Sequence, residues 1–464
     1  MTRLIYTGTD KHIDVVTITE RLKQYFASPQ FSQVKKYGEY YEGLNSDIVQ
    51  RHEDRKRRKK SPNNLVPTGY YSTVVDTMAG YLFSNVQYVG VDAQDIDYIK
   101  YLNGILMAND SDVKTMQTGV RALAFNRAYE LVYATSSSVP DDFDIHYTTV
   151  DPRNMVCVYD DAIEPEIVCG VRFLQSTNKD YKYDVDIIYA DEWQYYYWTK
   201  DNQLVQRKEP QALVFPVCPV IEYNTEILSD NSPFDVALPY IDALDYTLSG
   251  NSNEIERIVD ALLVLGTYVD DKDLQHMDEW KVLQGLQKED RAEYIEKNMS
   301  PEFRRYVTDV LTQEIHKHCH VVDWYSTDGT TGVMSAKALK TKLFDMDIYS
   351  KRLEKVYRKG EKKRLSLITF LMSAKSLPIG LVNIIYNRTL PDDIEDKILA
   401  LNNCVFLSDE TKVELTGLPW EREKKRLQRQ REENGIEIDD LTPPTNATPD
   451  ANDADEEDDD EQNS

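Results

Sequence analysis

One stretch of the sequence has a helical hydrophobic repeat that is unusually long and has small polar residues at its centre. Between residues 235 and 262, apolar residues recur at steps of three, four and seven, as on one face of an α-helix. At 1.5 Å per residue, such a helix is about 42 Å long. Because glycine and asparagine each cost an isolated helix up to about 1 kcal/mol, we expect this helix to need tertiary or intersubunit packing. The central residues are Ser249, Gly250, Asn251, Ser252 and Asn253.

A second helix is predicted on the other side of a compact insert. The insert, residues 263–300, is rich in Asp, Glu and Lys. Ser300, Pro301 and Glu302 then supply an N-cap, a proline at the first helical position and an acid at the positive end of the helix dipole. The two helices therefore predict a hairpin-like unit with the insert at its tip.

The remaining elements predict an α+β protein that is dominated by helices. Helices are expected at residues 17–26, 34–41, 66–83, 113–133, from 335 to about 371 with a kink near Gly360, at 391–401, and within 408–431. Strands are expected at residues 155–159, 167–174, 183–189, 194–199, 213–215 and 381–386, where β-branched and aromatic residues lie between turn residues. The sequence thus places an antiparallel sheet with one solvent-exposed face, within residues 144–222, between helical segments.

The composition is typical of a soluble globular protein with room for about three domains. The 464 residues are 41% hydrophobic and 29% charged. The sequence has no apolar run of about 18 residues, and residues 1–30 lack the features of a signal peptide. We therefore expect a soluble protein that is made in the cytosol and has no membrane partner.

The net charge of −26 argues against a protein that grips DNA over its whole surface. Twelve acids and no base lie between Glu437 and Glu461, which leaves about −14 for the rest of the chain. An acidic body suits a surface past which DNA slides. The acidic tail, residues 436–464, is rich in Pro, Asn, Asp and Glu and is predicted to be disordered.

Several short segments occur in a fixed order along the chain. These segments are YYEG at 40–43, NN at 63–64, YYSTVVDTMAGYLF, VDP at 150–152 followed by MVCVYDD, VIEYNTE, LPYIDALDYTLSGNSNEIERIVDALLVLG, VMSAKALKTKLFDMD, NIIYNRTLPDD and FLSDETKVELTGLP. In this combination and order, from Tyr40 to about Gly435, they resemble the portal proteins of SPP1-like siphophages. One departure is Ser335-Ala336, where family members commonly carry Ser-Gly.

The resemblance implies a ring, usually of twelve subunits, with a wing, a stem, a clip and a crown. It assigns residues 1–232 and 335–390 to the wing, 233–262 and 301–320 to the stem, 263–300 to the clip, 321–334 to a channel loop and 391–435 to the crown. The implied function is a channel for double-stranded DNA at one capsid vertex, used in DNA packaging, head–tail connection and genome ejection. The implied location is the virion, after assembly in the host cytoplasm.

The same resemblance implies the partners. These are further copies of the chain, double-stranded DNA, the terminase large subunit, the major capsid and scaffolding proteins, and a head–tail adaptor. Because a closed ring needs two different surfaces on each subunit, we expect the small residues from Ser249 to Asn253 to pack against a neighbouring subunit.

Two further segments are candidate sites. The basic run Arg55, Lys56, Arg57, Arg58, Lys59 and Lys60 could neutralise DNA phosphates or contact an acidic partner, although such runs are more often solvated surface loops. The resemblance places Thr327, Asp328, Gly329, Thr330, Thr331 and Gly332 in the channel loop. That segment lacks the Gly-Lys-Ser/Thr of a phosphate-binding loop, and an ordinary surface connection remains its alternative role.

No motif predicts a catalytic centre, a metal site or a cofactor. The five cysteines are isolated and are expected to be reduced and mostly buried. His316 and His320 would share a helix face, but no acid at matching spacing completes a zinc site. The competing hypothesis is a metal-dependent nucleic-acid-processing enzyme of a mobile element, which would act as a monomer or dimer. A third, a tail adaptor, is normally a much shorter chain.

Overall fold

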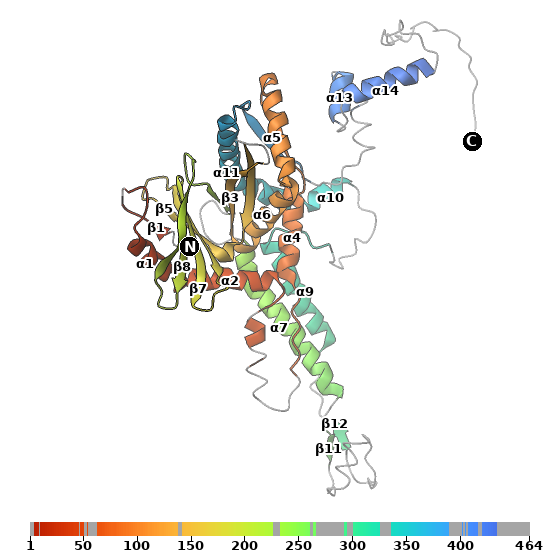
Figure 1. The fold of residues 1–464 in the computed structure, drawn as a ribbon. Helices are drawn as coiled ribbons and strands as arrows, with labels where there is room; N and C mark the ends of the chain where they lie inside the picture. The colour runs from red at the N-terminus through yellow and green to blue at the C-terminus, as the bar shows by residue number, and fades with distance from the viewer. Residues whose placement is uncertain are drawn as a thin grey trace, which may run out of the picture. The chain divides into compact units, whose positions relative to one another are not determined.

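The computed structural model contains two units, residues 1–390 and 391–464, which are described separately (Figure 1). It describes residues 4–8, 10–45, 47–50, 53, 63–137, 142–225, 233–259, 263–265, 292–294, 300–324, 336–388, 401, 404, 407–415 and 420–433. Within these ranges, no helix has the length and the apolar character that crossing a membrane requires.

A six-stranded sheet packs against an N-terminal helix. Its strand order is β1-β5-β6-β7-β8-β9, and all pairings are antiparallel except that of β1 with β5. Helix α1 (Val15–Phe26) buries Ile18, Leu22 and Tyr25 in one apolar cluster with residues of this sheet. The strands are β1 (Leu4–Ile5), β5 (Met155–Tyr159), β6 (Ile167–Gln175), β7 (Tyr181–Ile188), β8 (Glu192–Thr199) and β9 (Leu204–Ala212).

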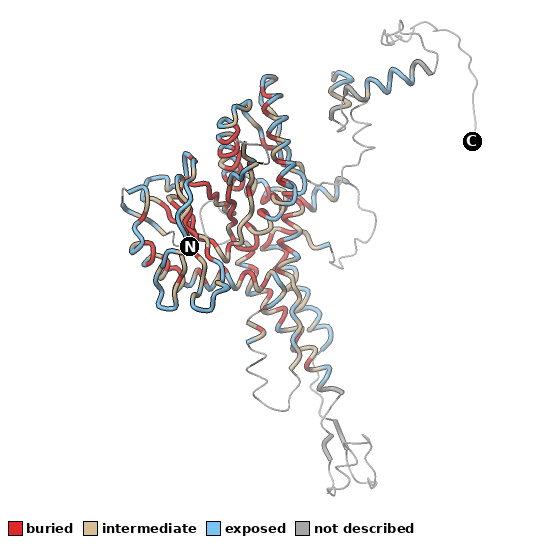
Figure 2. The backbone as a smooth tube through the Cα atoms, viewed as in Figure 1, coloured by how far each residue is buried: buried red, intermediate tan, exposed pale blue. Residues whose placement is uncertain are grey.

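The main core lies between helices and two smaller sheets. One sheet has the order β10-β3-β4, and the other pairs β13 with β2. The largest cluster of buried side chains joins these elements, and Figure 2 shows buried residues concentrated there. The elements are α2 (Pro29–Tyr41), α4 (Tyr70–Phe83), β2 (Val86–Gly90), α5 (Ile96–Ala108), α6 (Ser111–Phe125), β3 (Arg127–Ser136), β4 (Phe143–Val150), β10 (Val220–Asn224), α11 (Phe344–Ala374) and β13 (Val382–Tyr386).

Two long helices lie side by side and are joined through a small antiparallel ladder. Helix α7 (Pro233–Val259) packs along α9 (Pro301–His318) (Figure 1). Between them in sequence, β11 (Leu263–Leu265) pairs with β12 (Ala292–Tyr294). The helical repeat from residue 235 therefore forms the predicted helix, and Pro301 begins the second one.

A buried charged cluster connects α11 to the sheets. Arg364 has no exposed surface, and its guanidinium contacts the carboxylates of Glu130 on β3 and Glu361 on α11. Two tyrosines from the β2–β13 sheet, Tyr88 and Tyr386, donate hydrogen bonds to Glu361. Burial raises the pKa of the Glu361 carboxyl above its ordinary value.

Four sequence predictions of elements in this unit were wrong. The helix expected at residues 66–83 begins only at Tyr70. The helix expected at residues 113–133 ends at Phe125, because Asn126 adopts a left-handed conformation (φ 62°) and the chain turns into β3. The strand expected at 213–215 is replaced by β9, which ends at Ala212. The late helix divides into α10 (Ala336–Lys342) and α11 at Leu343, whereas α11 continues through Gly360, where the kink was expected.

The described part of the second unit contains two helices. Helix α13 (Asp409–Leu415) is preceded by Ser408, whose hydroxyl accepts a hydrogen bond from the backbone N–H of Thr411, as an N-cap does. Helix α14 (Trp420–Glu433) is strongly charged. The two helices agree with the prediction for residues 408–431, whereas most of the helix expected at 391–401 lies outside the described residues.

Candidate subunit interface

A polar stripe on α7 is covered by a segment from much earlier in the same chain. The stripe consists of Asp245, Ser249 and Asn253, all of which are buried. Backbone N–H groups of the covering segment, residues 63–69, donate to it. Asn64 donates to Asn253 (2.5 Å), Val66 to Ser249 (3.1 Å) and Thr68 to Asp245 (3.0 Å).

The spacing of these three hydrogen bonds follows from backbone geometry. Four residues of an α-helix rise about 6.0 Å, and two residues of an extended chain advance about 6.6 Å. Every second N–H of the covering segment therefore meets every fourth side chain of α7. The covering segment then enters α4 through Gly69, whose φ of 67° favours glycine.

The acidic end of the stripe is held by hydrogen bonds from α2 and the residues that follow it. The side-chain amide of Asn45 donates to Asp242 (3.0 Å) and to Asp245 (2.9 Å). Tyr40 also donates its hydroxyl hydrogen to Asp242. Burial raises the pKa of the Asp242 carboxyl, while the bonds from Tyr40 and Asn45 oppose that rise. One side of α7 is therefore packed within its own subunit.

The predicted interface residues divide between two environments. Ser249 and Asn253 face the covering segment, and Asn251 and Ser252 are half-buried. A Cβ atom added at Gly250 would have no neighbour within 4 Å. Gly250 lies one helical turn after Tyr246, whose side chain is 42% exposed. We call Tyr246 and Gly250 the open face of α7.

Helix α9 packs on α7 and leaves two aromatic residues in solvent. Arg304 of α9 pairs with Glu254 of α7 (2.6 Å), and both side chains are mostly buried. Phe303 is 58% exposed and Tyr306 is 65% exposed, and they lie three residues apart on the same helix. We call Phe303 and Tyr306 the aromatic face of α9. Large exposed aromatic side chains close together are typical of an interaction surface.

Two predicted sites lie outside the described residues. These are the channel-loop residues from Thr327 to Gly332 and the basic run from Arg55 to Lys60. The channel-loop segment is flanked by Trp324, which is exposed, and by α10. The ammonium group of Lys342 in α10 lies 5.6 Å from the centre of the Trp324 ring, a cation–π contact.

The histidines at the end of α9 each face a different carboxylate. Helix α9 ends at His318, and His320 has a φ of 53°, so the expected shared helix face of His316 and His320 does not form. His316 lies 3.8 Å from Asp323, and His320 lies 2.8 Å from Asp345. Among the residues that the structure describes, no group of three or more His, Cys, Asp or Glu is placed to hold a metal ion.

The cysteines are free, as expected. Cys157, Cys169, Cys218 and Cys319 are buried, and Cys404 is half-buried. Burial raises the pKa of the first four thiols, which keeps them protonated and unreactive.

The sequence signal for the covered side of α7 was incomplete. The acceptors Asp245, Ser249 and Asn253 could be recognised by their spacing of four residues. Three of the donors are backbone N–H groups, which every residue except proline carries. The hydroxyl of Thr68 also donates to Asp245, and the amide of Asn64 donates to Glu256, but one threonine and one asparagine do not by themselves predict the pairing.

Several solved structures are similar to this chain at low sequence identity. The virion of a native gene transfer agent particle has 12% identity and a TM-score of 0.45, covering 85% of this chain and 95% of the other. The neck of the empty particle has 12% identity and a TM-score of 0.43, covering 76% of this chain and 90% of the other. The neck of the native particle has 11% identity and a TM-score of 0.40, covering 76% of this chain and 89% of the other. No curated protein sequence matches this chain.

The sequence also matches a protein-family model over most of its length. The match spans residues 26–437, and the model describes SPP1 Gp6-like phage portal proteins. This span includes α7, α9, the covering segment and both helices of the second unit. The chain therefore belongs to the SPP1 Gp6-like family of phage portal proteins.

Proposed function

We propose that the protein closes into a ring of about twelve copies whose channel conducts double-stranded DNA at one vertex of a phage capsid. As a member of its family, the chain is a portal protein, a connector between head and tail. The family is structural rather than catalytic, which favours this function over the enzyme hypothesis.

The observation that carries the ring proposal is the pair of exposed surfaces on α7 and α9. The open face of α7 has a glycine with free space around it, and the aromatic face of α9 carries Phe303 and Tyr306. A cyclic ring needs two different surfaces that fit each other. The aromatic face of one subunit would pack on the open face of the next, where Gly250 allows close approach.

Family membership supports the assignment of the remaining regions. In the proposal, residues 233–262 and 301–320, which include α7 and α9, form the stem. Residues 263–300 form the clip, 321–334 the channel loop, 391–435 the crown, and 1–232 with 335–390 the wing. The terminase large subunit and later a head–tail adaptor would bind at the clip. Major capsid and scaffolding proteins would surround the wing, in the host cytoplasm during assembly and in the virion afterwards.

Sedimentation velocity and electron microscopy of the purified full chain test the ring. The parent protein should sediment as a ring of the order of ten subunits. Phe303→Glu and Tyr306→Glu should each leave the protein as monomers, because a buried unpaired charge disfavours the contact. Gly250→Leu and Ser252→Leu should also prevent closed rings, because they fill the space near the open face.

A matched control separates assembly from folding. Ile163 is a fully exposed apolar residue on the loop between β5 and β6, and Ile163→Glu should still form rings. Circular dichroism should show the same helix content in all five variants. Closed rings of Tyr306→Glu or Gly250→Leu would refute the proposed contact, and a parent protein that stays monomeric would refute the ring.

A further inference from the structure

Strand β2 has one edge that no described strand occupies. It pairs only with β13 among the described residues. The backbone N–H of Asn387 donates to the carbonyl of Asn85, and that of Val91 donates to the carbonyl of Leu381. Because bonded pairs alternate in an antiparallel ladder, the odd-numbered residues of β2 face β13. The N–H and C=O groups of Val86, Tyr88 and Gly90 therefore point away from it.

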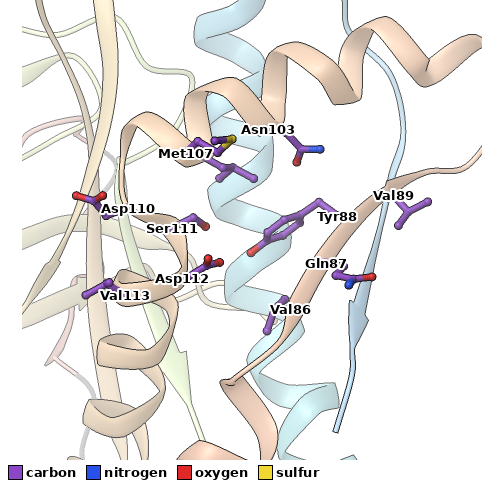
Figure 3. Close-up of a pocket in the computed structure, with 11 residues that line it drawn as sticks. Val86, Gln87, Tyr88, Val89, Asn103, Met107, Asp110, Ser111, Asp112 and Val113 are labelled. Carbon is purple, nitrogen blue, oxygen red and sulfur yellow. The ribbon is translucent and has the colours of Figure 1, made fainter. Parts of the chain in front are cut away.

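The free edge of β2 borders an open groove, which we call the edge groove. Its volume is about 650 Å³, and it is lined by β2, by the C-terminal half of α5 and by the first turn of α6 (Figure 3). Tyr88 points inward, and its hydroxyl bonds to Glu361. The inner side of β2 is therefore anchored to the buried charged cluster, which holds the free edge in place.

Apolar side chains surround the edge groove and remain in solvent. Met107 of α5 is 79% exposed, and Val113 of α6 is also exposed. On the outer side of the β2–β13 sheet, Val89, Val91 and Leu381 are exposed as well. A strand added at β2 would place alternate side chains on these two apolar surfaces.

The end of the edge groove at α6 is acidic. Asp110 and Asp112 line it, and both side chains are exposed. In the described part of the chain, Lys114 acts on Asp110 electrostatically, but its ammonium group donates hydrogen bonds to Asn109 and to the carbonyl of Tyr147. An occupant with a lysine or arginine at this end would bring a cation to the two carboxylates, whereas a nucleic acid would bring phosphates against them.

We propose that the edge groove binds an extended segment of a second protein, which adds as a strand to the free edge of β2. The segment has β-branched residues on both of its faces and a basic residue that meets Asp110 and Asp112. Backbone hydrogen bonds would supply affinity, and the apolar and acidic surroundings would supply specificity. This inference does not depend on ring formation.

Hydrogen exchange tests the state of the edge directly. In the assembled protein, the amides of Val86, Tyr88 and Gly90 should exchange faster than those of Gln87 and Val89, which face β13. If the amides of Val86, Tyr88 and Gly90 are protected in the assembled protein and lose this protection in the unassembled Tyr306→Glu variant, a second copy of the chain occupies the groove. That result would overturn the proposal of a separate partner.

Fluorescence anisotropy with synthetic heptapeptides tests the occupant. The probe alternates valine and threonine and ends in lysine; one comparison peptide ends in glutamate, and another is N-methylated at every second amide. The lysine peptide should bind about tenfold more tightly than either comparison peptide and should protect the amides of Val86, Tyr88 and Gly90. Equal binding of the three peptides, or no protection, would overturn the proposal.

Variants locate the binding to the edge groove. Met107→Glu should weaken binding of the lysine peptide about tenfold. Asp112→Lys should reverse the preference, so that the glutamate peptide binds more tightly than the lysine peptide. Ile96→Glu is the matched control, since Ile96 is an exposed apolar residue on α5 that does not line the groove. An equal loss in Met107→Glu and Ile96→Glu would contradict a specific site. All of these measurements remain possible if the parent protein forms no ring.

Discussion

Arg364 and Glu130 form an ion pair between α11 and β3, with Nη1 3.2 Å from Oε1, and neither side chain has any exposed surface. Glu361 lies on the same guanidinium at 3.1 Å. One cation thus faces two carboxylates inside the core. A buried charge is costly without a partner, so this contact makes α11 and the β10-β3-β4 sheet mutually dependent.

Removing the guanidinium should therefore be strongly destabilising. Arg364→Met keeps an apolar side chain of similar length but leaves Glu130 and Glu361 without a cation, and we expect a loss of about 3–5 kcal/mol in the free energy of unfolding. Urea denaturation of the full chain at a fixed protein concentration measures it. Arg305→Met is the control, because the Arg305–Asp309 pair is exposed and should contribute less than about 1 kcal/mol. Similar losses in Arg364→Met and Arg305→Met would contradict a stabilising role for the buried Arg364 ion pairs.

The buried cluster should also give stability a specific pH dependence. Burial raises the pKa of Glu361 above its ordinary value of 4.5, so the folded state holds this proton more tightly than the unfolded state does. The free energy of unfolding should then fall as the pH rises from about 4.5 through the raised pKa. Glu361→Gln, which stays neutral, should flatten this part of the curve.

Urea denaturation at each pH measures the parent protein and Glu361→Gln. A parent curve that rises over this range, or a Glu361→Gln curve with the parent's slope, would show that Glu361 does not hold its proton in the fold.

Local patterns predicted the elements whose form depends on their own residues. Strand β5 was predicted with its observed bounds, because its β-branched and aromatic residues lie in a short run between turn residues. The start of α9 at Pro301 was also predicted, because Ser300, Pro301 and Glu302 carry the signal locally. The long repeat from residue 235 likewise predicted α7 (Pro233–Val259), and residues 260–262 of the predicted helix lie outside the described residues.

The sequence was less informative where distant segments decide the structure. The change from α6 to β3 depends on a left-handed Asn126 and on the pairing of β3 with β10 and β4, which begin at Val220 and Phe143. The covered side of α7 depends on backbone donors at residues 64–68. Strand β9 was missed because its residues are mostly exposed and polar, as an edge strand requires.

Two glycines in helices should respond to alanine in opposite directions. A Cβ atom at Gly360 would lie 2.5 Å from Cδ1 of Tyr223, in the core between α11 and β10. Gly360→Ala should cost about 1–3 kcal/mol, because overpacking displaces the ring. A Cβ atom at Gly104 of α5 would meet nothing within 4 Å, so Gly104→Ala should gain up to about 1 kcal/mol from helix propensity. Thermal unfolding compares them, and a stabilised Gly360→Ala would contradict the close contact.

The covering segment should be released from α7 when the polar stripe loses an acceptor. Ser249→Ala removes the acceptor for the N–H of Val66. Asn253→Ala removes the acceptor for the N–H of Asn64. Each loss should cost about 1–2 kcal/mol and should speed hydrogen exchange at residues 64, 66 and 68. Thr247→Val is the matched control, because among the described residues the Thr247 hydroxyl bonds only to the carbonyl of Ala243, within α7. If Ser249→Ala and Thr247→Val leave exchange at Val66 equally slow, the covering segment is held by other contacts, and the matched spacing of helix and extended chain does not fix its register.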